Sequence, residues 1–193
     1  MTDDHSKNRV LLDSITAEYR RYRVMSEAAL AQVPEALLST PGPSNGNSLA
    51  IICWHVSGNL ASRFTNFLDS DGEKPWRARD EEFAPRSVSH AELMAKWAGG
   101  WNVLDETLAS LSDADLTRTV RIRGQELAVH EALFRSLAHV SYHTGQIVYV
   151  AHALCGERWS YLSIPPGQSA AYNSNPTKEK PGAFVEAVRP SGV

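Results

Sequence analysis

The sequence predicts an all-α protein, a four-helix bundle with a short β-hairpin before its last helix. Three observations carry this prediction. Apolar residues recur every three or four positions in four separate segments, which is the helical period. Stretches rich in glycine, proline and polar residues separate these segments, and two short alternating runs precede the last one. Because 193 residues suit one domain with its own core, the four helices are expected to pack together.

The first two helices are predicted from their apolar stripes and their boundaries. The first stripe covers residues 10–33 and ends at a proline. The second begins after Asn47 or Ser48, either of which can cap a helix, and continues to Phe67. An Asp-Gly pair at 71–72 is expected to end it.

The third helix follows a polar segment, residues 71–85, that we interpret as a long ordered loop. Ser89 and Glu92 form the S-x-x-E pattern of a capping box, and the apolar stripe behind them runs to Leu111. Gly99-Gly100 interrupts this stripe. Glycine weakens a helix, so close approach of a neighbouring backbone would explain the pair.

A hairpin and a fourth helix come next. Val120 and Ile122 alternate with arginines, and a second alternating run follows the pair Gly124-Gln125, which favours a hairpin with a Gly-x turn. The fourth helix covers about residues 130–154, with Gly156 suited to its C-terminal cap.

The remaining segment is rich in proline and has no sustained periodicity. We therefore divide the chain into a bundle, residues 1–158, and a C-terminal tail, residues 159–193. The tail is expected to lie partly on the bundle, because Trp159, Tyr161, Leu162 and Ile164 favour burial, and it is expected to be mobile beyond Asn175.

Composition excludes several classes. The net charge of −3, without a basic stripe, argues against nucleic-acid binding. No apolar run approaches the roughly 18 residues of a membrane span, and the N-terminus lacks the apolar region of a signal peptide. Cys53 and Cys155 lie in or beside apolar helical segments, which favours buried free thiols over a disulfide. A cytoplasmic protein is expected.

Three histidines are candidate ligands of one divalent metal ion. His139 and His143 stand four residues apart in the fourth helix, so their side chains are neighbours. His55 lies in the middle of the second helix, which antiparallel packing would bring opposite the pair. Three histidines leave a coordination position open, as in catalytic sites. The alternative is that they are ordinary polar residues, each with its own hydrogen bond.

Helical spacing also nominates substrate-binding residues near the histidines. Asn59 and Arg63 follow His55 by four and eight residues, Gln146 follows His143 by three, and Arg135 precedes His139 by four. They could equally line a solvent-filled cleft. Trp76 is expected to anchor the loop 71–83 beside the ion, where it would shape the substrate pocket; the alternative is a loop that only braces the bundle.

Known catalytic motifs are missing from the sequence. The stretch HVSYH, residues 139–143, lacks the glutamate of the H-E-x-x-H motif of metalloproteases. Neither histidine is preceded by a glutamate at the spacing of a di-iron bundle. Nucleotide-binding glycine motifs and the G-x-S-x-G motif of hydrolases do not occur.

The chain resembles the DinB-like superfamily of metal-binding four-helix proteins. The resemblance is carried by one histidine in the second helix and by the run HVSYHTGQI, residues 139–147. The motif SRFTNFLDSDGEKPWRARDEEF, residues 62–83, and the segment WSYLSIPPGQSAAYN, residues 159–173, are similar to one branch of unknown function within it. The resemblance implies an up-down-down-up bundle, zinc or nickel on the three histidines, and a homodimer. Its other members include transferases and isomerases that use low-molecular-weight thiols.

The leading functional hypothesis is therefore a metal-dependent transferase. The ion would bind a small external thiol, lower the pKa of that thiol and let it attack an electrophile. Metal-dependent hydrolysis is a variant, weakened because no carboxylate has the spacing of a general base. The competing class is a non-catalytic stress protein that binds the metal or a small molecule. A homodimer is also expected because five tryptophans are many for a small core.

Overall fold

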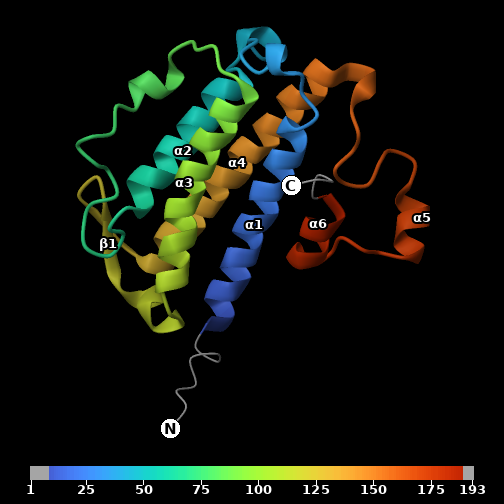
Figure 1. The fold of residues 1–193 in the computed structure, drawn as a ribbon. Helices are drawn as coiled ribbons and strands as arrows, with labels where there is room; N and C mark the ends of the chain where they lie inside the picture. Colours follow the sequence, from blue (N-terminus) through green and yellow to red (C-terminus); the bar gives the residue numbers. More distant parts are fainter. Residues whose placement is uncertain (1–8, 189–193) are drawn as a thin grey trace.

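The computed structural model describes residues 9–188 and is mostly helical. Four long helices lie side by side (Figure 1): α1 (Val10–Leu30), α2 (Leu49–Phe64), α3 (His90–Ser110) and α4 (Val129–Cys155). The antiparallel strands β1 (Thr119–Ile122) and β2 (Gln125–Ala128) form a hairpin directly before α4, and the short helices α5 (Ser169–Ser174) and α6 (Pro181–Val188) follow it. The predicted helical class and the position of the hairpin are thus confirmed.

Helix α2 begins as predicted and ends earlier than predicted. The Ser48 side chain caps it by accepting a hydrogen bond from the backbone N–H of Ile51 at 3.3 Å. The helix ends at Phe64, because Thr65 is extended and Asn66 has a φ of 47°. Phe67 is nevertheless buried, at 7% exposed. This burial continues the apolar stripe beyond the helix and explains why the end predicted near residue 71 was wrong.

Helix α3 begins with the predicted capping box. Ser89 Oγ accepts a hydrogen bond from the N–H of Glu92 at 3.2 Å, and the Glu92 carboxylate accepts one from the N–H of Ser89 at 2.8 Å. These two bonds satisfy backbone donors that have no partner inside the helix.

Helices α2 and α3 run in the same direction and approach closely. A Cβ atom on Gly100 would lie 2.6 Å from the Cα of Ser57, and Thr107 donates a hydrogen bond to the carbonyl of Phe64 at 2.9 Å. Both contacts advance by seven residues along each helix, which requires parallel axes. The predicted close approach therefore holds at Gly100, whereas a Cβ on Gly99 would meet no atom within 4 Å.

Parallel packing decides the course of the loop between these helices. A 16-residue helix is about 24 Å long, and the chain must return over that length before α3 begins. Residues 65–89, which we call the α2–α3 loop, make this return along the outside of α2 (Figure 1). The short 3-10 helix Asp80–Phe83 lies within the loop and packs on α2.

The hairpin turn differs by one residue from the prediction. Arg123 and Gly124 form it, with φ angles of 54° and 73°, instead of Gly124 and Gln125. A two-residue hairpin turn of this kind needs positive φ at both central positions. Asp71 stabilises the turn by accepting hydrogen bonds from the N–H groups of Arg123 at 2.7 Å and Gly124 at 2.6 Å. These hydrogen bonds connect the α2–α3 loop to the hairpin turn.

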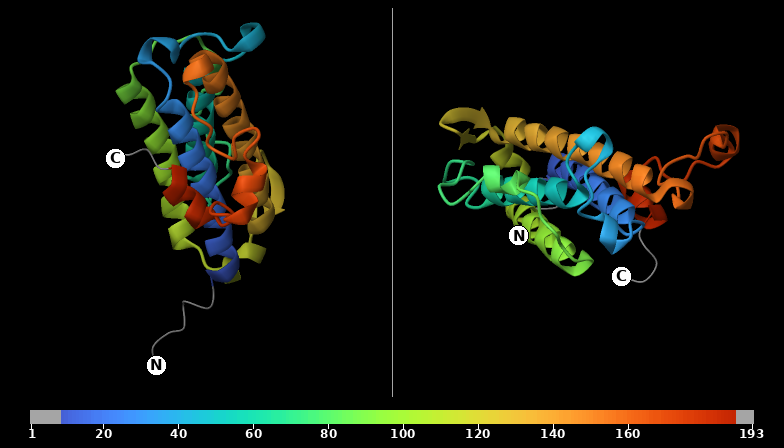
Figure 2. Two further views of the ribbon diagram at one scale, coloured as in Figure 1. Left: turned by 90° about the vertical axis from the view of Figure 1, so that its right-hand side faces the viewer. Right: turned by 90° about the horizontal axis from the view of Figure 1, so that it is seen from above.

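The C-terminal segment contains helices that the sequence pattern did not predict. Helix α6 packs on α1 (Figure 2), where Phe184 is 2% exposed and lies beneath the guanidinium group of Arg21. Trp159 stacks on His152 at a centroid distance of 5.3 Å, while Tyr161 is 45% exposed. The segment predicted to be mobile begins after Asn175 and so contains α6, which instead packs on α1; the last residues of the segment, 189–193, lie outside the described residues.

The core between the helices is apolar and contains both cysteines. Trp97 and Trp101 are almost fully buried in it, with exposures of 1% and 0%. Cys53 and Cys155 are buried and free, as predicted. None of the helices that the structure describes combines the length and the apolar character needed to cross a membrane.

Candidate metal centre

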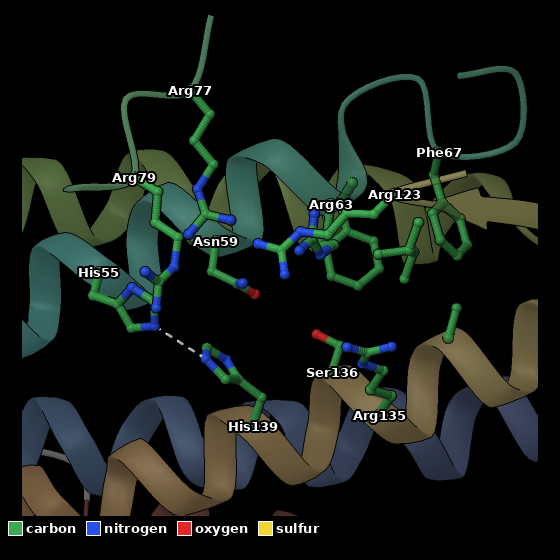
Figure 3. A pocket seen from close by; sticks show the side chains of 13 residues that line it. His55, Asn59, Arg63, Phe67, Arg77, Arg79, Arg123, Arg135, Ser136 and His139 are labelled. Carbon is green, nitrogen blue, oxygen red and sulfur yellow. Dashed lines mark hydrogen bonds between the residues drawn. The ribbon is translucent and has the colours of Figure 1, made fainter. Parts of the chain in front are cut away.

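Two helices bring the three predicted histidines together. His55 lies on α2, and His139 and His143 lie one turn apart on α4, which faces α2. Figure 3 shows the His55 and His139 rings pointing toward one another across the space between these helices. One nitrogen atom from each of the three rings lies within 4.8 Å of the others. The helical spacing thus produces the cluster that the sequence predicted.

The distances between the ring nitrogens suit a bound ion. Nε2 of His139 lies 3.2 Å from Nε2 of His55 and 3.1 Å from Nε2 of His143. Imidazole nitrogens at 2.0–2.1 Å from a tetrahedral zinc ion are roughly 3.3–3.4 Å apart. The three histidines are therefore already close to the spacing of a ligand set and could hold one metal ion.

The outer nitrogens of two rings are held by neighbouring side chains. Nδ1 of His55 lies 2.9 Å from Oε2 of Glu82, and Nδ1 of His143 lies 2.7 Å from Oε1 of Gln146. Gln146 in turn donates a hydrogen bond to the hydroxyl of Tyr142 at 3.2 Å, which leaves its oxygen facing His143. Such hydrogen bonds place the proton of each imidazole on Nδ1 and fix the orientation of the ring.

These protons leave the inner side of the cluster with lone pairs. A neutral imidazole has one N–H and one lone pair, so Nε2 of His55 and Nε2 of His143 both present lone pairs to Nε2 of His139. His139 can donate a proton to only one of them. In at least one of the two contacts, two lone pairs would then face and repel each other. A cation between the nitrogens would bind both lone pairs and remove this repulsion. The donor set therefore fits a divalent metal ion.

The pKa values of the histidines also favour binding of a metal ion. Burial, together with the charges of His143 and His55, lowers the pKa of His139 to about 3. Burial also lowers the pKa of His143 to about 4, against the hydrogen bond with Gln146, which raises it. Metal ligation requires neutral imidazole. Both side chains are therefore in the ligating form at neutral pH.

The α2–α3 loop supplies two residues that the sequence pattern did not predict. Glu82 is 7% exposed and receives two hydrogen bonds from Arg77, at 2.8 Å and 2.9 Å, in addition to that from His55. Burial raises the pKa of Glu82, but the hydrogen bonds from His55 and Arg77 outweigh it, so the pKa lies below its usual value. Glu82 is therefore a carboxylate, whose charge favours a cation on the other side of His55.

Helix α2 makes room for this carboxylate with a glycine. A Cβ atom on Gly58 would lie 2.7 Å from the carboxyl carbon of Glu82. Phe83, next in the loop, packs on the His55 ring at a centroid distance of 4.7 Å. No helical spacing could reveal these contacts, because 27 residues separate His55 from Glu82. The glycine in mid-helix was the one available signal.

A cavity of about 180 Å³ begins at the histidines and extends between α2 and α4 toward the hairpin (Figure 3). Among the residues predicted to bind substrate, Asn59, Arg63 and Arg135 line it, and Gln146 contacts His143 instead. Trp76 does not line it and is 56% exposed. The other lining residues are His55, Phe64, Phe67, Arg77, Arg79, Ile122, Arg123, Ala132, Ser136 and His139.

The α2–α3 loop does line the cavity, but with arginines and not with the predicted Trp76. Arg77 and Arg79 line the cavity, whereas Trp76, their neighbour in the chain, points to solvent. The ion pair of Arg77 with Glu82 draws that side chain inward, to 2% exposed. Three described histidines lie outside the cluster: His90 begins α3, His130 contacts the carbonyl of Leu116, and His152 stacks on Trp159.

Comparison with known proteins gives one match. The model of a family described as "Protein of unknown function (DUF1572)" matches residues 6–168, a range that contains the four long helices, the hairpin and every residue of the cluster. No curated protein and no solved structure matches the chain.

Proposed function

The chain belongs to the DUF1572 family of proteins of unknown function, and we propose that it binds a divalent metal ion. We propose further that this ion takes part in a reaction of a small-molecule substrate. His55, His139 and His143 would hold the ion. The observation that carries the proposal is the convergence of three Nε2 atoms, two of which have their opposite nitrogens engaged by Glu82 and Gln146. A set of three neutral histidines is typical of catalytic zinc sites with an open position.

We also propose that the fold is a DinB-like four-helix bundle. The chain directions in Figure 1, with α2 and α3 parallel to each other and opposite to α1 and α4, agree with an up-down-down-up order. The histidine positions, one on α2 and two on α4, agree with the ligand pattern that the resemblance implies. Zinc and nickel both suit imidazole ligands.

The activity that we propose is transfer of a low-molecular-weight thiol to an electrophilic substrate. A bound divalent ion supplies Lewis acidity that lowers the pKa of a thiol at its open position. The thiol must come from outside, because Cys53 is 0% exposed and burial raises its pKa well above the usual range. Cys155 is also buried and donates its proton to the carbonyl of Gln32. Residues of the chain would orient the reactants, with Glu82 fixing His55 and Asn59 lining the approach.

An assay of electrophile consumption tests this activity. Metal-loaded protein and the His55→Ala variant would be incubated with a generic electrophile and a panel of small thiols. We expect thiol-dependent consumption with the wild-type protein and loss of most of it in the variant. Equal rates for both proteins, or no rate above background with any thiol, would favour the alternative of a non-catalytic stress protein that binds the metal or a small molecule.

Metal-dependent hydrolysis remains a second candidate. The sequence offered no carboxylate for a general base, and the structure corrects that view by bringing Glu82 to the cluster. Its two oxygens are occupied by His55 and Arg77, so it is better suited to orient a ligand than to accept a proton from water. Because His55 and Arg77 occupy Glu82 in this way, we favour thiol transfer over hydrolysis.

Assembly and location belong to the same proposal. We propose a cytoplasmic homodimer without nucleic-acid or membrane partners. Phe134, Tyr142 and Tyr149 support a dimer, because they lie at helical spacing on α4 and are 54%, 64% and 65% exposed. The tryptophan count gives less support than expected, since Trp97 and Trp101 are buried in the core. Light scattering that finds a monomer at micromolar concentration would exclude the dimer.

A further inference from the structure

Arginine side chains line the cavity from the space beside His55 to the end near the hairpin. We call this group the arginine chamber; its members are Arg63, Arg77, Arg79, Arg123 and Arg135. They come from α2, the α2–α3 loop, the hairpin turn and α4, so four separate segments direct positive charge into one space. Figure 3 shows Arg63, Arg77, Arg79 and Arg123 on one side of the cavity and Arg135 on the other.

Protein carboxylates balance only part of this charge. Glu73 pairs with Arg63 at 3.1 Å and with Arg123 at 2.9 Å, and it lies 4.0 Å from Nη1 of Arg77. Glu82 pairs with Arg77 at 2.8 Å. Thus two carboxylates serve three of the arginines.

The other two arginines have little or no charge compensation. Arg79 has only Asp80, a fully exposed residue 3.8 Å away. Arg135 has no hydrogen bond or ion pair with any residue that the structure describes. The chamber therefore carries an excess of positive charge, although Arg79 and Arg135 are exposed, so solvent screens part of their charge.

One buried donor in the chamber has no partner. The side chain of Arg77 is 2% exposed, and its Nε and Nη2 atoms bind Glu82. Its Nη1 atom is buried without a hydrogen-bond partner in the described part of the chain; Oε2 of Glu73, at 4.0 Å, lies beyond hydrogen-bond distance. Because the two other nitrogens face Glu82, Nη1 faces the opposite way, and Figure 3 shows this guanidinium group beside Asn59 and Arg63 at the edge of the cavity. A buried charged donor without an acceptor is unfavourable, so this atom favours an acceptor from outside the chain.

We propose that the arginine chamber binds a dianionic oxyanion group of a small substrate, of the kind that a phosphate monoester or a dicarboxylate carries. Planar guanidinium groups form paired hydrogen bonds with both kinds of oxyanion. A dianion matches the charge excess better than a single carboxylate does. The volume of about 180 Å³ corresponds to roughly a dozen water-sized groups, which selects a small molecule over a polymer.

The position of the chamber connects it to the histidines. His55 and His139 line the same cavity, so a substrate held by its anionic group extends its other end toward the proposed ion. Arg77 contributes to both ends, since it holds Glu82 against His55 with two nitrogens and offers the third to the anion. The anion site itself consists of arginines alone; only the placement of the reacting end rests on the proposed function.

Calorimetric titration tests the chamber directly. Inorganic phosphate, succinate and acetate would be titrated into the full chain at constant ionic strength, both as purified and after treatment with a chelator. We expect saturable binding of phosphate, succinate or both in the two preparations, with acetate at least about tenfold weaker. Binding of phosphate alone would identify a phosphate ester as the substrate class, and binding of succinate alone a dicarboxylate.

The variants Arg135→Gln and Arg79→Gln serve as the structural test. Arg135 has no hydrogen bond or ion pair in the described residues. Arg79 is half-exposed and contacts Asp80 at 3.8 Å and the ring of Phe83 at 5.0 Å, so neither change should prevent folding. Each is expected to weaken dianion binding about tenfold, the effect of losing one charged hydrogen-bonding group. The control Arg158→Gln removes the same charge from an exposed residue near the end of α4 and should bind as the wild type does.

The outcomes separate the chamber from the metal centre. Equal affinity in all three variants, acetate binding as tightly as the dianions, or no saturable binding would overturn the chamber proposal. Metal content measured on the same samples reports on the proposed function. Metal without dianion binding would refute only the chamber, and dianion binding without metal would refute only the metal centre.

Discussion

The two parts of the cavity between α2 and α4 are built in different ways. At one end, three histidines project from regular helices, and burial holds the pKa of His139 at about 3 and that of His143 at about 4. Along the rest of the cavity wall, arginines from the α2–α3 loop and the hairpin turn join Arg63 and Arg135, and carboxylates balance only some of them. The histidines offer uncharged nitrogen ligands beside the Glu82 carboxylate and suit a cation, whereas the arginines make the cavity positive and suited to an anion.

The difference shows how helices and loops contribute to one site. A helix fixes the spacing of its side chains, so two ligands four residues apart are neighbours wherever the helix lies. A loop has no such period, and its side chains are positioned by tertiary contacts such as the pair of Arg77 with Glu82. Loss of a histidine should therefore abolish metal binding. Changes in the loop should weaken metal binding less, because the loop only orients a ligand and supplies charge.

The largest effect is expected from His139→Ala. His139 contacts both other histidines, so its loss leaves two ligands that no longer share a neighbour. We expect metal content to fall from close to one divalent ion per chain to below about one tenth, an affinity loss of at least about 100-fold. Elemental analysis measures it, with His152→Ala as the control outside the cluster. Unchanged metal in His139→Ala would refute the ligand assignment.

A smaller effect is expected from Glu82→Gln, which tests the contribution of the loop. Glutamine keeps the shape of Glu82 and removes the charge that orients His55 and pairs with Arg77. We expect metal affinity to fall about 10- to 100-fold, the range for groups that orient ligands. The adjacent Glu81→Gln is the matched control, because Glu81 is exposed. If both variants bound metal equally well, the loop would have no part in the metal centre.

The close approach of α2 and α3 can be tested with neighbouring glycines. In Gly100→Ala the new methyl group meets the backbone of Ser57, and we expect the free energy of unfolding to fall by about 1–3 kcal/mol. Gly99→Ala meets no atom and should stabilise the helix by up to about 1 kcal/mol. Denaturant titrations of the two variants compare these values. A similar stability for both would contradict the close approach of α2 and α3 at Gly100.

The smallest effect concerns pH. The folded chain lowers the pKa of His139 and His143 from about 6.5 to about 3 and about 4, so below pH 6.5 the unfolded state binds more protons than the folded state. Stability of the metal-free protein is then complete above pH 6.5 and decreases as the pH falls toward 4. We expect a loss of about 1 kcal/mol between pH 7 and pH 5, after allowance for solvent screening. Urea titrations of metal-free protein measure this, and a shallower dependence is expected in His139→Ala. An equal dependence in both would show that His139 does not titrate in this way.

Local patterns in the sequence determined the helices, the capping box at Ser89 and the approximate place of the hairpin. They also determined that His139 and His143 are neighbours, because a spacing of four residues is a consequence of helix geometry alone, whereas His55 joins them through the packing of α2 on α4. Asn59, Arg63 and Arg135 followed from the same geometry, since each lies a whole number of turns from a histidine and all three line the cavity.

Tertiary structure alone decided the rest. The end of α2 at Phe64, the turn at Arg123-Gly124 and the packing of α6 on α1 depend on contacts with distant segments. Glu82 and Arg77 reach the histidines because α2 and α3 are parallel, which requires the loop to return along α2, and because Gly58 leaves space for a carboxylate there. The spacing of side chains along a helix can be read directly from the sequence. The position of a loop side chain depends on many weak contacts, which form only after the helices have packed.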